Sequence, residues 1–290
     1  MERDFAIITD SACDMPADFL RDNGVICVRL GFTMQNVNYE GECGERISEK
    51  DFYAKLRAGA MPTTYQVTGE TAKAYMAQPL KQGKDVLVIA FSSALSGTAD
   101  SFFVAKRALE EKYPKRKIYV IDSLCASMGQ GLLLHYVLKK SDEGVGIEET
   151  ARYAEEIKGK ICHYFTVDNL FHLKRGGRVS TTTALVGSIL KIKPVLRVNE
   201  MGKLVTCGKA MGRRKALNAL VERFAQNRDL AKNEPVFISH GDCIEDAEYV
   251  KEAVAKISPE NPIKIHYIGA VIGSHAGAGT VALFYKGKGR

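Results

Sequence analysis

Three strand-like runs in this chain each end in a cluster of small hydroxyl and acidic residues that precedes a helix-like segment. The runs cover residues 5–9, 86–91 and 117–121, and the clusters begin at Asp10, Ser92 and Asp122. Alternating strands and helices predict a mostly parallel sheet with helices on both faces. Ligands of such sheets bind outside the carboxyl ends of the strands, where hydroxyls and free N–H groups favour an anion. The repetition therefore predicts a small-molecule site for an acid or a phosphate.

The second half of the chain shows a different pattern. Strands are expected at residues 161–166, 195–198, 203–207, 236–239 and 263–268, and helices at 170–174, 182–190, 215–227 and 245–257. Residues 199–203 read as a hairpin turn, because Gly202 adopts a left-handed conformation without steric cost. We therefore expect an α/β protein with two domains. Residues 1–160 would form the parallel-sheet domain, and residues 161–290 an α+β domain with a mixed or antiparallel sheet.

Length and composition bound the class of protein. The chain has 290 residues, enough for two domains, and its 46% hydrophobic and 26% charged residues are typical of a globular protein. No run of about 18 apolar residues predicts a transmembrane helix. The charged start, Met1 to Asp4, does not resemble a signal peptide. We therefore expect a cytoplasmic protein without stable membrane insertion.

Charge and cysteine usage exclude further classes. The net charge of +7 is spread along the chain, without the basic stripe and motif that nucleic-acid binding requires. The seven cysteines are scattered and form no Cys-x-x-Cys pair. This usage predicts reduced thiols and no zinc site. Neither a phosphate-binding loop nor a Gly-x-Ser-x-Gly elbow is present.

Two hydroxyl-rich segments are candidates for ligand binding. Five hydroxyl residues fall within Ser92 to Ser101, near Gly97 at an expected helix start. Such residues also cap helices, and spacing alone leaves a ligand role for Ser93 and an ordinary cap equally open. The second segment carries Thr63 and Thr64 directly after a proline. Its alternative interpretation is an ordinary cap for the helix from residue 69.

Two glycine-rich segments carry cations or a histidine. Residues 173–180 contain two glycines beside Arg175 and Arg178, whose guanidinium groups suit a carboxylate or a phosphate. A surface turn is the alternative, and the sequence alone favours it. His275 lies in a glycine-rich stretch next to a hydroxyl residue, where its ring could donate a hydrogen bond to an anion. A lone histidine is more often structural.

Seven motifs in order along the chain resemble the DegV family of bacterial lipid-binding proteins. They are Thr9-Asp-Ser-x-x-Asp14, Pro62-Thr-Thr64, Ser92-Ser-x-Leu-Ser-Gly-Thr98, Asp122-Ser with Ser127-x-Gly-x-Gly131, Leu173-Lys-x-Gly-Gly-Arg178, Leu190-x-x-Lys-Pro194 and Ile272-Gly-Ser-His-x-Gly-x-Gly279. The resemblance spans nearly the whole chain. It implies a two-domain α/β fold that encloses one long-chain fatty acid, such as palmitate, in an apolar tunnel between the domains.

The resemblance also implies site residues. The carboxylate would be held by Thr63 or Thr64 and by Ser93, with His275 near the same head group. Ser92, Arg175 and Arg178 would border the site or contact a partner. No cofactor other than the bound lipid, no metal and no catalytic residue is implied.

In better-studied relatives, the fatty acid passes to a separate ATP-dependent kinase subunit that makes acyl phosphate for phospholipid synthesis. The resemblance therefore implies a lipid-binding protein without catalytic activity of its own. The chain departs from the family pattern at Tyr65, Ala278 and Met211. Two alternatives stay open: a hydrolase or kinase acting alone, with Ser93 or His275 as nucleophile or base, and a regulatory protein with a structural lipid.

Overall fold

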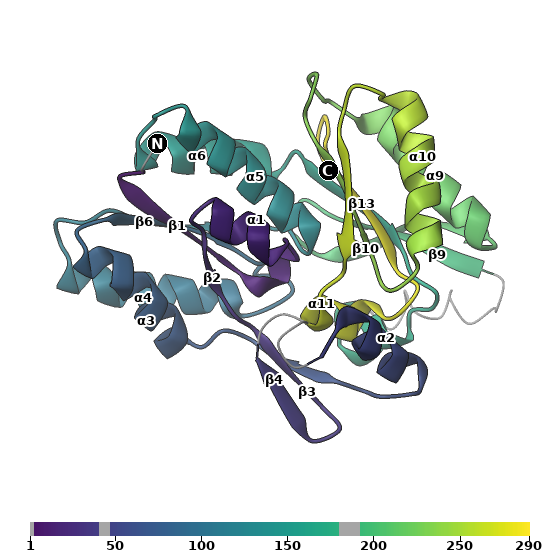
Figure 1. Ribbon diagram of the computed structural model, residues 1–290, viewed down its shortest axis with the longest axis horizontal. Helices are drawn as coiled ribbons and strands as arrows, with labels where there is room; N and C mark the ends of the chain where they lie inside the picture. The colour runs from purple at the N-terminus through teal and green to yellow at the C-terminus, as the bar shows by residue number, and fades with distance from the viewer. Residues whose placement is uncertain (1–2, 41–46, 180–191) are drawn as a thin grey trace.

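The computed structural model describes residues 3–40, 47–179 and 192–290. This part of the chain forms three sheets (Figure 1), of which one is parallel, one mixed and one antiparallel. The α/β fold class predicted from the sequence is confirmed, with a parallel sheet in the first half and a mixed sheet in the second. The helix expected at 182–190, and the beginning of the motif at 190–194, lie outside the described residues.

The parallel sheet has the strand order β2-β1-β6-β7, and all its strand pairs are parallel. Its strands are β1 (Phe5–Asp10), β2 (Ile26–Val28), β6 (Asp85–Ala90) and β7 (Ile118–Asp122). Successive side chains of β6 alternate between two buried clusters, one on each face of the sheet. The apolar runs that predicted these strands are continuous because both faces are covered.

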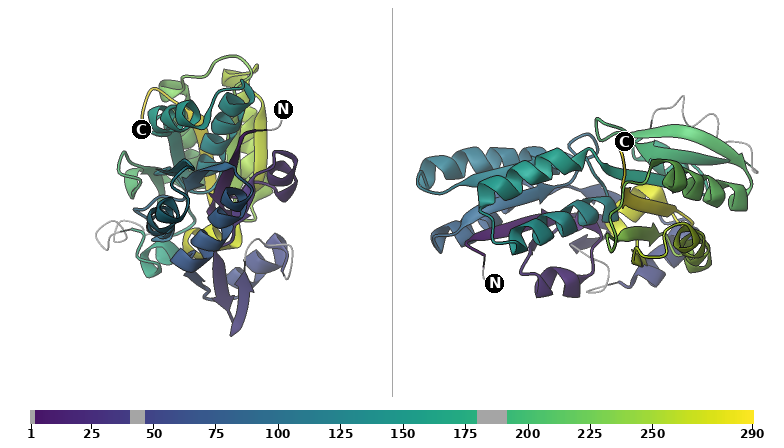
Figure 2. Two further views of the ribbon diagram at one scale, coloured as in Figure 1. Left: turned by 90° about the vertical axis from the view of Figure 1, so that its left-hand side faces the viewer. Right: turned by 90° about the horizontal axis from the view of Figure 1, so that it is seen from above.

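Helices pack on both faces of this sheet, as Figures 1 and 2 show. One face carries α3 (Gly69–Lys81) and α4 (Thr98–Lys112), and the other carries α5 (Met128–Asp142) and α6 (Ile147–Lys158). The short elements η1 (Ser11–Cys13) and α1 (Ala17–Asp22) follow β1. Helix α5 is buried nearly throughout and also contacts the mixed sheet, so one apolar cluster connects the two sheets.

The mixed sheet has the order β10-β9-β8-β13-β11-β12, in which only β11 and β12 pair in parallel. Its strands are β8 (Ile161–Thr166), β9 (Ile192–Val198), β10 (Leu204–Met211), β11 (Val236–His240), β12 (Ile263–Tyr267) and β13 (Val281–Lys286). Helices α9 (Arg213–Asn227) and α10 (Ile244–Ile257) cover its outer face. The predicted hairpin turn joins β9 to β10, with Gly202 at a φ of 73°.

Strand β13 lies in the middle of the mixed sheet, although the sequence analysis did not predict it. Its side chains alternate, so that Ala282 and Phe284 face the parallel sheet while Leu283 and Tyr285 face α9 and α10. Because the strand is buried on both faces, its residues form a continuous apolar run without a polar alternation. Its inner face becomes part of the candidate site.

A third, antiparallel sheet has the order β4-β3-β5. Its strands are β3 (Gly31–Met34), β4 (Val37–Glu40) and β5 (Thr63–Tyr65). The segment interpreted as a loop around Thr63 and Thr64 thus contains a short strand, in which Thr64 pairs with Phe32. Helices α2 (Glu49–Arg57) and α11 (Ala270–Ala276) lie close to this sheet, and α7 (Phe171–Arg175) contacts α11.

Candidate functional site

A mainly apolar cavity of about 160 Å³ lies between the inner face of the mixed sheet and the ends of the parallel strands. Aromatic and aliphatic side chains from both halves of the chain form its wall, among them Phe91, Leu95, Phe165, Val271 and Phe284. Hydrogen-bonding side chains also line the cavity, among them those of Thr64, Ser96, Arg178 and His275. An apolar space with a few polar groups suits a small amphipathic ligand.

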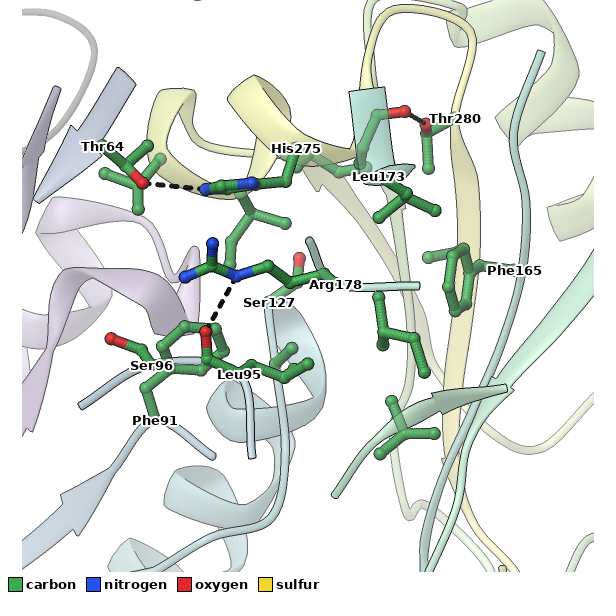
Figure 3. Close-up of a pocket in the computed structure, with 18 of the residues that line it drawn as sticks. Thr64, Phe91, Leu95, Ser96, Ser127, Phe165, Leu173, Arg178, His275 and Thr280 are labelled. Atoms are coloured by element: carbon green, nitrogen blue, oxygen red, sulfur yellow. Dashed lines mark hydrogen bonds between the residues drawn. The ribbon is translucent and has the colours of Figure 1, made fainter. Parts of the chain in front are cut away.

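Thr64 and His275 meet at one side of this cavity (Figure 3), where Thr64 Oγ1 and His275 Nε2 lie 2.8 Å apart. Strand β5 supplies the threonine and α11 supplies the histidine. Neighbouring residues of a strand point to opposite faces, and Thr63 is exposed and does not line the cavity. Of the two threonines that the sequence left open, Thr64 is therefore the one at the cavity.

The imidazole of His275 is a neutral group at physiological pH. Its pKa is lowered to about 4, mainly by burial and in addition by the charges of Arg178 and Arg175 and the ring of His172. The Nδ1 atom is buried and has no hydrogen-bond partner among the described residues. Gly176 lies directly against this atom, since a Cβ at that position would come within 2.1 Å of it. His275 therefore offers a neutral ring held in a tight space.

Arg178 places a cation beside the cavity without an acidic partner. Its Nε donates to the carbonyl oxygen of Leu95 at 3.0 Å, and its Nη1 donates to that of Gly176. Burial lowers its pKa, and no Asp or Glu of the described residues contributes to that shift. A half-buried guanidinium group without an anion is energetically unfavourable. An anion in the cavity would offset this cost.

Arg175 has a different place from Arg178. Its Nη2 donates to the carbonyl oxygens of Pro62 at 3.1 Å and Ser274 at 3.2 Å. The residue does not line the cavity. The guanidinium group instead ties the segment before β5 to α11, and so holds Thr64 and His275 at their observed separation.

The serine cluster that follows β6 is divided among three roles. Ser92 is buried and donates to the carbonyl oxygen of Gly202 at 3.0 Å, which links the parallel sheet to the β9–β10 turn. Ser93 is exposed and lines an open depression beside the cavity, together with Gly177 and Lys203. Ser96 lines the cavity itself. Ser96 is not among the residues expected at the site from the sequence, although it stands directly before the helix-start Gly97.

The acidic residues of the strand-end clusters lie outside the cavity wall. Asp10 accepts hydrogen bonds from the N–H groups of Ala12 at 3.1 Å and Phe91 at 2.8 Å, and burial raises its pKa to about 7. Asp122 accepts from the N–H groups of Ser93 and Leu124, both at 3.1 Å. These carboxyl groups connect the loops at the edge of the sheet. The polar groups that line the cavity include hydroxyls, two imidazoles and a guanidinium group, and no carboxylate of the described residues is among them.

Metal ligation and membrane crossing find no support in the described part of the chain. No group of three or more His, Cys, Asp or Glu side chains there is arranged to hold a metal ion. None of the helices described is long and apolar enough to cross a membrane.

Fold and cavity define an α/β protein with a mainly apolar ligand cavity between two sheets. The family model described as "Uncharacterised protein, DegV family" matches residues 4–288, and the chain belongs to this family. A DegV domain-containing protein of Clostridium perfringens is 44% identical over 283 residues, which cover 98% of this chain and 97% of that protein. A DegV domain-containing protein of Streptococcus pyogenes is 34% identical over 285 residues, 98% of each chain.

Solved structures of two family members resemble this fold over almost their whole length. One is a DegV family protein of Thermus thermophilus for which fatty acid binding is described. It has a TM-score of 0.85 and 28% identity. The similarity covers 98% of this chain and all of that one. DegV of Bacillus subtilis, described as a fatty acid binding protein, has a TM-score of 0.82 and 26% identity, with 99% of this chain and 100% of the other covered.

Proposed function

We propose that this protein binds one long-chain fatty acid, such as palmitate, with the acyl tail in the cavity and the carboxylate beside Arg178. The observation that carries the proposal is a half-buried guanidinium group that faces an apolar cavity and has no acidic partner among the described residues. The carboxylate of a fatty acid would pair with the guanidinium group, and its long apolar tail would fill the cavity. Fatty acid binding by the Thermus and Bacillus relatives supports the same ligand class.

The proposed head-group site consists of Arg178, Thr64, His275 and Ser96. Arg178 supplies the charge, while the hydroxyls and the neutral imidazole fix the orientation of the carboxylate. Thr63 and Ser93, which the family resemblance also implies, are exposed. We therefore place Ser93 at the rim, in the open depression, and Thr63 outside the head-group contact. The tail supplies most of the binding free energy, because each buried CH₂ contributes about 0.8 kcal/mol.

We further propose that the protein is not catalytic by itself and presents its fatty acid to a separate ATP-dependent kinase that forms acyl phosphate. Two features support this part. His275 has no carboxylate partner in the described structure that would orient it as a catalytic base. The depression lined by Ser93, Gly177 and Lys203 adjoins Arg178, which leaves the head group within reach of a second protein.

A cytoplasmic location, and a lipid tunnel between domains 1–160 and 161–290, belong to the same proposal. The six cysteines in the described residues are free thiols, which persist in a reducing compartment. The proposed domain boundary falls between α6 and β8, so every strand of the parallel sheet lies on one side and every strand of the mixed sheet on the other.

Extraction of the purified protein, followed by mass spectrometry, tests the ligand. We expect a long-chain fatty acid in near-stoichiometric amount, and an extract without lipid would contradict the proposal. Titration of the delipidated protein with a fatty acid and its methyl ester tests the carboxylate contact, and the acid should bind more tightly. Assays of ATP and acyl-ester turnover by the isolated chain test the non-catalytic part, since turnover of either compound would favour a stand-alone enzyme.

A further inference from the structure

The cavity follows the strand direction of the mixed sheet. Thr280, Ala282 and Phe284 are alternate residues of one segment, and all three line the cavity. On β8 the alternate residues His163 and Phe165 do the same. Ala282 pairs with Phe165, and Phe284 with His163, so these residues form successive rows across the sheet. At about 3.3 Å per residue, Thr280 and Phe284 lie roughly 13 Å apart along the cavity wall.

The row that contains Phe284 and His163 continues across two further strands. Tyr164 pairs with Arg197, so Val198 lies next to His163, and Val198 pairs with Leu204. All four residues of this row line the cavity, one from each of four neighbouring strands: Phe284, His163, Val198 and Leu204. Leu204 also lines the open depression next to Arg178, so this end of the row lies near the proposed head group. We call the residues at the other end of the row, Phe284 and His163, the stop row.

The cavity lining does not extend beyond the stop row along β8 and β13. The next pair on the same face is Ile161 with Lys286, and neither residue lines the cavity. Ile161 is fully buried in the apolar cluster, and Lys286 Nζ forms an ion pair with Glu234 at 2.5 Å. The other end of these strands lies near Thr280 and α11, which carries His275. The stop row is therefore the wall remote from the Thr64–His275 contact.

His163 makes this wall rigid. Its Nδ1 bonds to the carbonyl oxygen of Ile161 at 2.9 Å, and its Nε2 accepts from the N–H of Ala126 at 3.3 Å. The ring packs edge-to-face on Phe284 with 5.3 Å between the ring centroids. On the α5 side there is room only for a glycine, because a Cβ at Gly129 would approach the His163 ring within 2.0 Å. With both nitrogens engaged, the ring offers the cavity its carbon edge.

We propose that the stop row sets the maximum length of the acyl chain that the protein accommodates. This inference rests on the proposed fatty-acid function. A tail that enters from the head-group side gains apolar contact with each methylene until its end meets the Phe284–His163 pair. A longer tail must displace the fixed ring of His163, and its additional methylenes contribute no affinity.

Titration of the delipidated protein with saturated fatty acids that differ by single methylenes tests the inference. For the unchanged protein, affinity should rise about fourfold per methylene, which corresponds to ~0.8 kcal/mol, and then level off or fall at a limiting chain length. Ala282→Leu fills the cavity one row before the stop row, and should move this limit to shorter acids. The longest acid that fits the unchanged protein should then bind about tenfold more weakly or worse, since the loss of two methylene contacts corresponds to ~16-fold.

Phe284→Leu opens the stop row and should move the limit to longer acids. Leu283→Val is the matched control, because Leu283 lies between the two test positions but faces α9 and α10 instead of the cavity. Circular dichroism and thermal unfolding establish that each variant is folded. A limit that stays unchanged in both Ala282→Leu and Phe284→Leu would overturn the stop row while leaving the fatty-acid function intact. Failure of the unchanged protein to bind any acid of the series would overturn both.

Discussion

At the residue scale, the site depends on one cation with an unusual environment. Arg178 follows two glycines, and Gly177 has a φ of 71° that allows the tight turn after α7. The turn directs the guanidinium group between Leu95 and the cavity, as Figure 3 shows. Sequence reasoning from this segment favoured a surface turn. The guanidinium group is partly buried because the fold brings residue 178 next to residue 95. The local sequence around residue 178 does not show this contact.

Arg178→Gln should weaken the binding of a fatty acid by about tenfold to a hundredfold, because a charge-assisted contact to a buried carboxylate contributes roughly 1.5–3 kcal/mol. The binding of the methyl ester should change much less. Isothermal titration of the delipidated protein with both ligands measures the difference. Arg152→Gln, on the exposed face of α6, is the matched charge control. Equal losses for acid and ester would place the carboxylate elsewhere.

His275 should make the delipidated protein less stable in acid. Its pKa is lowered from 6.5 to about 4, so the unfolded chain binds more protons than the folded one in this window. The free energy of unfolding therefore decreases as the pH falls from about 6.5 to about 4, by up to ~3 kcal/mol from this group. Urea unfolding over this pH range should show a smaller decrease for His275→Gln. Parallel curves for both proteins would contradict the assigned environment of the ring.

At the scale of elements, the loops after the parallel strands hold the site in place through buried polar contacts. Asp10 connects the end of β1 to Phe91 at the end of β6, and Arg175 connects the segment before β5 to α11. These acids and cations belong to the clusters that the sequence analysis singled out for ligand binding. Residue type alone does not distinguish a side chain that supports a loop from one that faces a ligand.

Asp10 should contribute a pH dependence of opposite sign to that of His275. Burial raises its pKa from 3.8 to about 7, so the folded state holds a proton that the unfolded chain has lost. Stability from this group therefore decreases as the pH rises from about 4 to about 7. In Asp10→Asn this decrease should disappear, as urea unfolding in the same pH series measures. A variant that loses stability with rising pH as steeply as the unchanged protein would refute the raised pKa.

Gly176 should be required for the shape of the head-group site. In Gly176→Ala the new Cβ would lie 2.1 Å from His275 Nδ1, so the ring must shift and its 2.8 Å contact with Thr64 must change. We expect about a tenfold loss of fatty-acid affinity with little change in the far-ultraviolet circular dichroism spectrum. Gly159→Ala is the matched control, because a Cβ there meets nothing within 4 Å. Unchanged affinity in Gly176→Ala would mean that the position of His275 does not matter for binding.

The sequence predicted some elements better than others for identifiable reasons. The strands of the parallel sheet were evident because they are uninterrupted apolar runs followed by polar turns. Strand β13 has the same character but follows a glycine-rich segment, and it was missed. The strands of the third sheet are short, and residues 63–65 are partly exposed, so no periodicity marked β5. The pairing of Thr64 with Phe32, which places Thr64 at the cavity, therefore had no local signal.

At the scale of the whole molecule, the cavity exists only because two sheets and α5 pack together. Phe91 and Leu95 come from one half of the chain, and Phe165 and Phe284 from the other. Thr64, Arg178 and His275 are far apart in sequence, and no spacing rule brings them together. Their common location was indicated beforehand only by the resemblance to the DegV family, whereas the place of Ser96 and the exposure of Ser93 came from the structure.

A crystal structure of the protein with a bound long-chain fatty acid is the most direct test of the proposed function. We expect one elongated ligand between the two sheets, with its carboxylate in contact with Arg178 and the Thr64–His275 pair and its tail directed toward Phe284. Ordered water throughout the cavity, or a ligand whose carboxylate lies away from Arg178, would contradict the proposal.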